Sequence, residues 1–464
     1  MRHHCLTLAA LAAIFFGCPS TARCQNTGFA TERPVEDRLR DLESTVQQLQ
    51  QAKIAPSADV KPAITAGWDE KKGFFLQSPD NQFFLRITGQ VQTDYRQAQD
   101  EHDALDLPGF SIRRARLGIE ATVFEHYEYR FLPEFGQGNI RLQDAYLNIH
   151  YWNEVQFEAG KFKQPFSYEQ LIQDRFVPFM ERSLIDQLVP ARDIGLMLHG
   201  TKLFDDRIDY GASIYNGVIN GDSDTDRNKE AAGRIAVRPL RALGLPDWAE
   251  PIQLGIAGTF GNDRGVLAPN PLRTPAGVPW FQFLPTVRPD GTRTRWSPEV
   301  AYFYGPLGFA AQYYDESQEL LAPAAKKLPA TVVDVRYRGG YAMGTLLLTG
   351  ETRTTYSQAI MPLAPFDPRE GCYGPGAWEL VGRVSWLDLS ANDPAAFGRL
   401  MDPLRSATRA TELTVGFNWY LNGWVRLLFN YEHAQFNNGV RLGTTNANKL
   451  DHQNTFMGRF QIIF

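Results

Sequence analysis

The fold of this chain is decided by the stretch Leu85-Arg86-Ile87-Thr88-Gly89-Gln90-Val91-Gln92-Thr93-Asp94-Tyr95-Arg96. Its odd positions carry apolar or small residues, and its even positions carry charged or hydrogen-bonding residues. Alternation with a period of two predicts an extended strand with one apolar and one polar face. The pattern recurs in residues 114–123, 127–135 and 144–151. Four such strands in succession need water on the polar face. A membrane barrel supplies that water in its lumen, while lipid covers the apolar face.

The composition is typical of an all-β membrane protein. The chain has 464 residues, and its 39 Gly, 30 Phe and 18 Tyr suit strands with girdles of aromatic residues. Charged residues make up 21% of the chain, and no apolar run reaches the roughly 18 residues of a transmembrane helix. A helical membrane bundle is therefore excluded. The net charge of −5 does not favour a nucleic-acid partner.

The N-terminal residues predict export. Arg2 precedes the apolar run 6–16, and small residues follow, which indicates a signal peptide over residues 1–24 and Sec-type export. The alternative is a lipoprotein site at Cys18, which the bulky Phe16 disfavours. Cleavage after Cys24 would leave Cys372 as the one cysteine, so we expect no internal disulfide.

Residues 25–66 predict a periplasmic extension with a short coiled-coil helix over 35–52 and a Pro-containing linker after it. The apolar residues of the helix follow the 4-3-4-3 spacing of a coiled-coil seam: Val35, Leu39, Leu42, Val46 and Leu49. Two heptads are too short to associate alone, so the helix would assist an oligomer formed elsewhere. The alternative is an amphipathic helix that lies on the protein's own surface.

Residues 67–464 predict a transmembrane antiparallel β-barrel of about 16 strands, with 18 as the alternative. The expected strands are 83–97, 110–124, 126–135, 140–151, 154–163, 192–200, 207–217, 230–238, 252–261, 294–304, 308–316, 334–350, 377–389, 411–421, 424–436 and 454–464.

Short turns on one side and long loops on the other are typical of outer-membrane barrels. Two features disturb this pattern: a long segment at 351–376 on the short-turn side, and a possible turn at Arg338-Gly339-Gly340. The last strand alternates up to an aromatic terminus, Phe464, as expected of a strand that closes a barrel and leaves no edge.

The connection 164–191 predicts a loop that folds into the lumen and narrows it. Gln164-Pro165-Phe166 ends the preceding strand, since proline cannot donate to a strand ladder. The loop mixes apolar residues with charged ones, which suits contact with an inner barrel wall. We take Arg175, Arg182 and Arg192 as the basic candidates of this constriction. An external cap or an oligomer contact is the alternative.

The sequence carries no signature of an enzyme. Nucleophile, zinc-protease, P-loop and CxxC motifs are absent, and the eight histidines show no metal-ligand spacing. Asp222, Asp224 and Asp226 imitate the start of a calcium loop, but Arg227 stands where that loop needs glycine. We therefore expect no catalytic residue, no metal site and no cofactor, and Cys372 reads as an inert loop residue.

Basic residues on the polar strand faces are the candidates for function. Guanidinium groups stay charged and offer forked donors that match phosphate and carboxylate oxygens. We expect these residues to line the pore and to bind anions: Arg86, Arg96, Arg114, Arg116, Arg130, Arg141, Lys161 and Lys163. The alternative is that acids on the same faces pair with them and leave a pore of weak selectivity: Asp94, Glu120, Glu128, Glu134 and Asp144.

Several short motifs, taken in order, resemble those of the phosphate-selective porin O and P family. They are Gly89-Gln90-Val91-Gln92-Thr93-Asp94-Tyr95, Arg113-Arg114-Ala115-Arg116-Leu117-Gly118, Gln143-Asp144-Ala145-Tyr146, Gly160-Lys161-Phe162-Lys163-Gln164-Pro165-Phe166, Arg192-Asp193-Ile194-Gly195, Leu348-Thr349-Gly350-Glu351 and Gly376-Ala377-Trp378-Glu379-Leu380-Val381-Gly382-Arg383. The resemblance covers residues 73–464 and implies a trimeric outer-membrane channel of sixteen strands with passive uptake of anions.

The family's basic residues fall inside the matching motifs at six positions: Arg113, Arg114, Arg116, Lys161, Lys163 and Arg192. Arg113 departs from the strand register because it shares the apolar face with Ala115, so a bulge or a place at the rim is expected there.

The expected function is a passive porin in the outer membrane of a diderm bacterium that prefers small anions such as phosphate or polyphosphate. Outer-membrane lipid, small anions and two further copies of the chain are the expected partners. The alternatives are a general porin of weak selectivity, and a plugged barrel that anchors the envelope through residues 25–66. An outer-membrane lipase is weaker, because His126, His150 and His199 lack a nucleophile and a carboxylate beside them.

Overall fold

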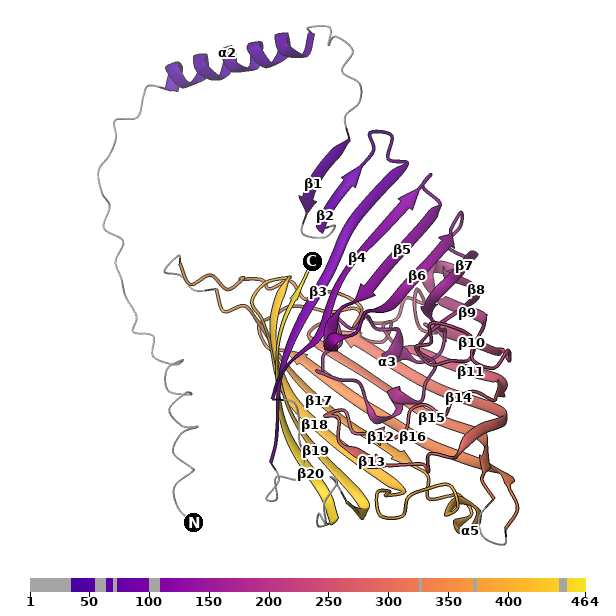
Figure 1. Cartoon of the computed structure of the whole chain (residues 1–464). Coiled ribbons are helices and arrows are strands. Elements are labelled where there is room, and N and C mark those ends of the chain that lie inside the picture. The colour runs from indigo at the N-terminus through magenta and orange to yellow at the C-terminus, as the bar shows by residue number, and fades with distance from the viewer. Residues whose placement is uncertain are drawn as a thin grey trace, which may run out of the picture. The chain divides into compact units, whose positions relative to one another are not determined.

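In the computed structural model, sixteen antiparallel strands close into a barrel (Figure 1). The structure describes residues 35–54, 64–69, 73–99, 109–324, 328–369, 374–441 and 449–464. The barrel strands are β3 (Phe83–Ala98), β4 (Phe110–Val123), β5 (Tyr127–Glu134), β6 (Arg141–Ile149), β7 (Gln156–Lys163), β8 (Arg192–Lys202), β9 (Ile208–Tyr215), β10 (Glu230–Val237), β11 (Gln253–Asp263), β14 (Arg288–Tyr304), β15 (Leu307–Ala322), β16 (Thr331–Leu347), β17 (Ala377–Asp388), β18 (Arg409–Tyr420), β19 (Val425–Arg441) and β20 (Lys449–Ile463).

The ring closes where β20 pairs with β3, with Gly458 opposite Tyr95. Two further strands belong to the same sheet but lie outside the ring: β1 (Thr65–Asp69) and β2 (Gly73–Gln77). β2 pairs with the beginning of β3, ahead of the part that β20 covers. The predicted sixteen-stranded barrel is confirmed, and the alternative of an eighteen-stranded barrel is wrong, because β1 and β2 lie outside the ring.

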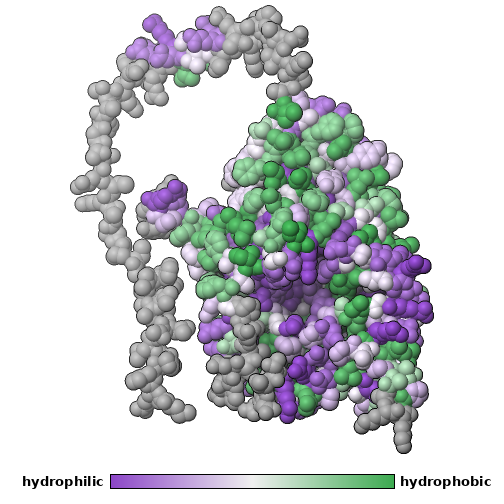
Figure 2. All heavy atoms as spheres, viewed as in Figure 1, coloured by the Kyte–Doolittle hydropathy of each residue, from purple (hydrophilic) through white to green (hydrophobic). Residues whose placement is uncertain are grey.

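The strands are apolar outside and polar inside. Leu117 and Phe157 face outwards and are 53% and 42% exposed, whereas the inward Gln92 and Asp94 are fully buried. Figure 2 shows hydrophobic residues spread over the outer face of the strands in the upper half of the view, and hydrophilic residues around the hollow beneath them. An outer surface with exposed apolar side chains suits lipid, as the alternation predicts.

The connections hold the remaining short elements of the barrel unit. These are η1 (Gly136–Gly138), α3 (Tyr168–Leu171), η2 (Leu184–Gln187), α4 (Leu203–Asp206), β12 (Leu272–Arg273), β13 (Pro279–Phe281) and α5 (Pro394–Phe397). β12 and β13 form a separate two-stranded sheet.

Residues 1–62 form a separate unit, in which α2 (Val35–Ile54) is the described element. A helix is therefore present where the coiled coil was predicted. The signal peptide, most of the linker and Cys372 lie outside the described residues. Across the described ranges, no helix is both long and apolar enough to cross a membrane.

The possible turn at Gly339-Gly340 is not present, because β16 runs through both glycines. A Cβ on Gly339 would lie 2.5 Å from Cγ2 of Ile185, in the connection between β7 and β8. The absence of a side chain at Gly339 thus allows the connection between β7 and β8 to pack against β16. The long segment between β16 and β17 folds inwards, and its Tyr356 is buried edge-on against Phe303 of β14.

The hydrophobic core lies inside the barrel, on one side of it. It joins the inward residues of β14 to β19 to apolar side chains from long connections, among them Phe179, Ile185, Trp280, Phe281 and Phe397. These connections fill that half of the lumen. The other half, along β3 to β8, keeps a polar lining.

A charge placed on the lipid face should test the barrel's orientation. We expect Leu117→Arg, in the middle of β4, to destabilise the folded barrel by about 2–4 kcal/mol, because arginine is costly at the bilayer midplane. Phe110→Arg lies on the same face at the strand end and should cost about 0–1 kcal/mol. Urea unfolding in lipid vesicles measures both. Equal costs at the two positions would show that this face does not meet lipid.

Candidate functional site

The connection 164–191 crosses the lumen from β7 and β8 to the far wall. Ser167 Oγ donates to Gln312 Oε1 of β15 at 2.8 Å, and the backbone N–H of Met180 donates to Asn430 Oδ1 of β19 at 2.8 Å. Asn418 Nδ2 of β18 donates to the carbonyl of Pro178 at 2.9 Å. The prediction that this loop lies against the inner wall is confirmed, and an external cap is excluded.

A buried ion cluster fixes the loop to β17 and β18. Arg383 donates to Glu169 of the loop at 3.2 Å and to Glu412 of β18 at 3.1 Å. All three side chains are at most 1% exposed. Arg383 also donates to the backbone carbonyl of Glu181 at 2.9 Å and lies over the ring of Phe179. Each of these charges depends on the others, because an unpaired charge in such a place is strongly unfavourable.

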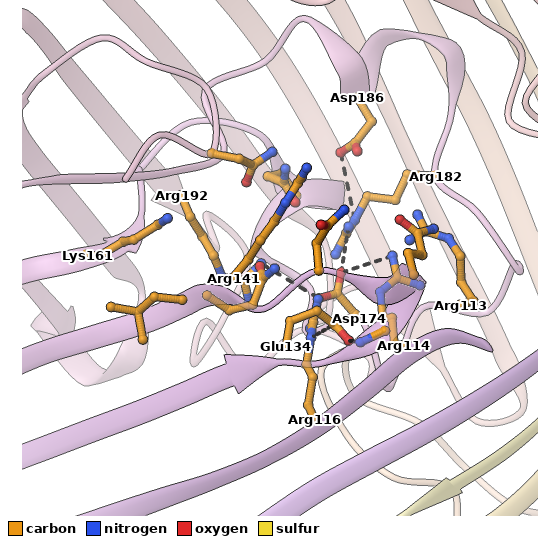
Figure 3. A pocket seen from close by; sticks show the side chains of 17 residues that line it. Arg113, Arg114, Arg116, Glu134, Arg141, Lys161, Asp174, Arg182, Asp186 and Arg192 are labelled. Carbon is orange, nitrogen blue, oxygen red and sulfur yellow. Dashed lines mark hydrogen bonds and ion pairs between the residues drawn. The ribbon is translucent and has the colours of Figure 1, made fainter. Parts of the chain in front are cut away.

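On the near wall, the loop carboxylate of Asp174 sits among four guanidinium groups (Figure 3). Arg182 lies 2.7 Å from it, Arg116 donates to it directly, and Arg192 and Arg114 lie at 3.7 and 3.9 Å. Burial alone would raise the pKa of Asp174, but Arg182 and then Arg116 hold that pKa well below its usual range. The carboxylate is therefore charged at neutral pH.

A second loop carboxylate, Glu181, sits in a similar cradle. It pairs with Arg96 at 2.6 Å, Arg113 at 2.7 Å and Arg459 of β20 at 3.1 Å. Burial would raise the pKa of Glu181, but Arg113 and Arg96 hold it well below its usual range. Arg459 also pairs with Asp94 of β3 at 2.6 Å, so Glu181 fastens the loop at the closing strands.

Arg113 reaches this cradle through a β-bulge. The β3–β4 register passes from Gln92–Arg114 to Thr93–Ile112, which leaves Arg113 as the extra residue. A bulge redirects a side chain without moving the rest of the strand. Arg113 therefore points into the lumen although the alternation places it on the apolar face, and the expected bulge is confirmed.

Three adjacent hollows lie beside the loop. The long-loop hollow spans about 1090 Å³, including space open to solvent, and is lined by Arg113, Arg114, Arg116, Glu134, Gly136, Gln137, Asn139, Arg141, Leu142, Gln143, Lys161, Gln170, Asp174, Arg182, Asp186, Arg192 and Asn220. The short-turn hollow, about 1060 Å³, is lined by residues such as Arg86, Arg175, Phe176, Trp424 and Phe464.

Between them lies the neck, a hollow of about 300 Å³, including space open to solvent, that is lined by Thr88, Gly89, Gln90, Arg116, Arg130, Leu132, Gln173, Asp174, Arg175 and Arg192. It shares Arg116, Asp174 and Arg192 with the long-loop hollow, and Thr88, Gln173 and Arg175 with the short-turn hollow. Because neighbouring hollows share lining residues, the neck lies between the other two.

Most of the predicted basic residues line these hollows. In the long-loop hollow these are Arg114, Arg116, Arg141, Lys161, Arg182 and Arg192, and in the other two Arg86, Arg130 and Arg175. Arg96 and Lys163 instead secure the loops: Arg96 donates to Ala276 O at 3.0 Å and pairs with Glu181, and Lys163 Nζ donates to Gln170 O at 2.6 Å. Arg192, expected within the constriction loop, is the first residue of β8.

Acids on the strand faces pair with many of these cations, as the alternative reading expected. Arg86 pairs with Glu120, Arg116 with Glu134 at 2.6 Å, and Arg192 with Asp144 at 2.6 Å. Arg130 lies between two of these acids, 3.1 Å from Asp144 and 3.3 Å from Glu120. Glu128 instead accepts from Asn148 at 2.9 Å.

Pairing leaves some of these cations without a close acid among the described residues, although Asp144, Glu181 and Asp222 pair with lining cations from outside the lining of the long-loop hollow. The long-loop hollow is lined by seven basic and three acidic side chains. Among the described residues, no ion pair within 4 Å is found for Arg141 or Arg175, and Arg114 has only the distant pairs at 3.9 and 4.0 Å. The buried Nε of Arg114 has no hydrogen-bond partner among the residues that the structure describes.

The sequence analysis missed Asp174, the residue at the centre of the site. The loop itself was recognised from its mixture of apolar and charged residues. An acidic residue in a loop that faces an arginine-rich wall was the signal that could have identified Asp174. The three aspartates that imitate a calcium loop make separate contacts: Asp222 with Lys161, Asp224 with Lys229, and Asp226 with Asn228. Over the residues that the structure describes, no group of three or more His, Cys, Asp or Glu is placed to hold a metal.

The sequence profile of the family described as phosphate-selective porin O and P matches residues 85–262 and 285–464. The chain belongs to this porin family. Its fold and its family are those of channels in the outer membrane of Gram-negative bacteria, which confirms the expected location. The comparison with curated proteins finds no match.

Among solved structures, the porin resembles OmpT, an outer membrane protein of Vibrio cholerae in a trimer form, with 11% identity over 82% of this chain and 99% of that chain and a TM-score of 0.47. It also resembles the outer membrane channel DcaP of Acinetobacter baumannii, with 12% identity over 84% of this chain and 99% of that one and a TM-score of 0.47.

Removal of the loop's central anchor should destabilise the porin. We expect Arg383→Met to cost about 3–5 kcal/mol, because Glu169 and Glu412 would stay buried without their partner. Arg409→Met is the matched control: it breaks the β17–β18 pair with Asp388 at a guanidinium that is 55% exposed, and should cost about 0–1 kcal/mol. Urea unfolding followed by tryptophan fluorescence compares them. A small loss for Arg383→Met would show that the loop does not depend on this cluster.

Proposed function

We propose that this porin is a passive channel for small hydrophilic anions, phosphate among them. The observation that carries the proposal is the excess of cationic side chains lining the three hollows. Among the described residues, Arg141 and Arg175 have no carboxylate within 4 Å, and Arg114 has only those at 3.9 and 4.0 Å. Guanidinium groups offer forked donors that match the oxygens of phosphate and carboxylate. The family's printed description, phosphate-selective, agrees with this chemistry.

In the proposed path, an anion enters the long-loop hollow and meets Arg141, which is exposed there. It then passes Arg114 and Arg116, enters the neck beside Arg175, and leaves through the short-turn hollow. Uptake is by diffusion, and no reaction is part of the proposal. Conduction needs sites that attract the ion but release it again, and arginines already shared with carboxylates provide such moderate attraction.

Loss of the two least paired cations of the long-loop hollow should weaken anion preference. We expect Arg114→Gln with Arg141→Gln to lower the anion-to-cation permeability ratio roughly three-fold, since two positive charges leave the path while the loop keeps its close ion pairs. The reversal potential in a potassium chloride gradient across a planar bilayer measures the ratio, and phosphate added to one side tests block of the chloride current.

The control removes the same charge away from the path. Arg264→Gln with Arg405→Gln alters two exposed loop arginines that line none of the three hollows and should leave the ratio unchanged. An equal effect of both double variants would show that Arg114 and Arg141 do not line the path. Large conductance with weak selectivity would leave a general porin, and silence from a folded barrel would favour the plugged envelope anchor.

We propose further that the porin assembles as a homotrimer in outer-membrane lipid once the signal peptide has been removed. A three-stranded coiled coil of α2, in the periplasmic extension, assists this assembly. The seam residues Leu39, Leu42 and Val46 are 53%, 63% and 47% exposed in the single chain. Exposed apolar side chains at coiled-coil spacing are buried when copies of the helix associate.

Cross-linking of the purified porin in detergent should give a ladder that ends at three chains. Leu42→Lys should weaken the trimer without abolishing it, because two heptads contribute only part of the association. Light scattering gives the mass of both proteins. A monomer for the unaltered protein would overturn the trimer, and an unchanged heat resistance of the variant's trimer would remove α2 from the interface.

A further inference from the structure

We propose that the arginines around Asp174 form an oxyanion site that the loop's own carboxylate occupies, so that Asp174 sets how strongly the passage holds a permeating anion. The ligand class is a small oxyanion, a carboxylate or a phosphate. This inference rests on the proposed anion channel and deepens it. The inference assigns the strength of anion binding to a loop acid, whereas the proposed anion channel requires only the basic residues of the wall.

The first step is the geometry of the cradle. Asp174 is 6% exposed. Arg182 reaches Oδ1 at 2.7 Å, and Arg116 donates to Oδ2. Arg192 and Arg114 stay at 3.7 and 3.9 Å, which is beyond hydrogen-bond contact. Figure 3 shows Arg114, Arg116 and Arg182 arranged around the carboxylate from different sides. Four forked donors around one carboxylate exceed what that carboxylate can accept at close range.

The second step is that the cradle has unused capacity. Arg114 donates to Gln92 Oε1 at 2.8 Å, and its buried Nε has no hydrogen-bond partner among the described residues. The Arg192 and Arg116 groups are shared with the wall acids Asp144 and Glu134. An incoming oxyanion of the size of a carboxylate or phosphate finds donors of the correct kind here, but it meets the negative charge of Asp174.

The third step is position. Asp174 lines both the long-loop hollow and the neck, as do Arg116 and Arg192. An anion on the proposed path therefore passes directly beside the carboxylate at the smallest of the three hollows. Repulsion from Asp174 weakens binding there, and weaker binding lets the anion leave. The loop acid thus keeps an arginine-rich neck from trapping its ligand.

A comparison with Glu181 distinguishes the proposed role of Asp174 from that of a residue that only anchors the loop. Glu181 is also a loop carboxylate in a cradle of three arginines, with contacts of 2.6 to 3.1 Å. It does not, however, line any of the three hollows. Neutralising Glu181 removes a loop anchor of similar strength whose carboxylate lines none of the three hollows, which makes it the matched control for Asp174.

The experiment compares Asp174→Asn, Asp174→Glu and Glu181→Gln with the unaltered porin in planar bilayers. We expect Asp174→Asn to raise the anion-to-cation permeability ratio roughly five-fold, and to lower the phosphate concentration that halves the chloride current by a similar factor. Asp174→Glu keeps the charge and should behave like the unaltered porin. Glu181→Gln should change either quantity less than about two-fold, because its carboxylate lines none of the three hollows.

Conductance in 1 M salt checks that the loop has stayed in place, because screening at that concentration leaves the pore's width as the main determinant. An unchanged ratio for Asp174→Asn, or equal shifts for Asp174→Asn and Glu181→Gln, would overturn the inference and reduce Asp174 to an anchor. If Asp174→Asn does not assemble, Arg182→Gln probes the same cradle. It should lower the ratio, and no change would again contradict the proposal.

The two proposals fail in different ways. Failure of the anion channel appears in the unaltered porin, as a cation-side reversal potential or as no block by phosphate. Failure of the Asp174 inference leaves the unaltered porin anion-selective and sensitive to Arg114→Gln with Arg141→Gln, while Asp174→Asn has no effect of its own.

Discussion

The structure depends on the closure of the hydrogen-bonded ring between β20 and β3. In the hydrocarbon of a bilayer, a backbone N–H or C=O without a partner is strongly unfavourable, so a sheet there cannot keep an open edge. The pairing of residues 455–463 with 90–98 removes that edge. Once the ring is closed, each strand must direct its apolar face to lipid and its charged face inwards. The lumen thereby collects the charges of sixteen strands.

Those charges explain why a loop enters the barrel. Guanidinium groups packed on an inner wall need partners, because unpaired buried charge is costly. Strand acids such as Glu134 and Asp144 supply some partners, and the loop residues Glu169, Asp174 and Glu181 supply others. The loop is therefore held at several separate places by ion pairs. The same pairing leaves the passage with moderate rather than extreme positive charge, which suits an ion that must both enter and leave.

The asymmetry of the lumen follows from where apolar residues lie in the long connections. Phe179, Ile185, Trp280 and Phe397 pack against the inward faces of β14 to β19 and fill that half. The hydrophobic effect thus acts inside a barrel whose outer surface is also apolar. The long-loop hollow and the neck lie in the other half, along β3 to β8.

The sequence by itself determined the class of fold, because alternation is a local property that each strand displays on its own. Residues 83–97, for example, were recognised as a strand from side-chain type alone, and the structure has Phe83–Ala98 there. Arg114 and Arg116 of β4 and Arg141 of β6 were likewise assigned to the lumen. Only the tertiary structure decided which charges meet. Glu169 and Arg383 lie 214 positions apart, Arg113 turns inwards through a bulge, and Asp174 reaches its cradle by crossing the lumen. Such contacts depend on how distant segments are brought together, and no local pattern encodes that geometry.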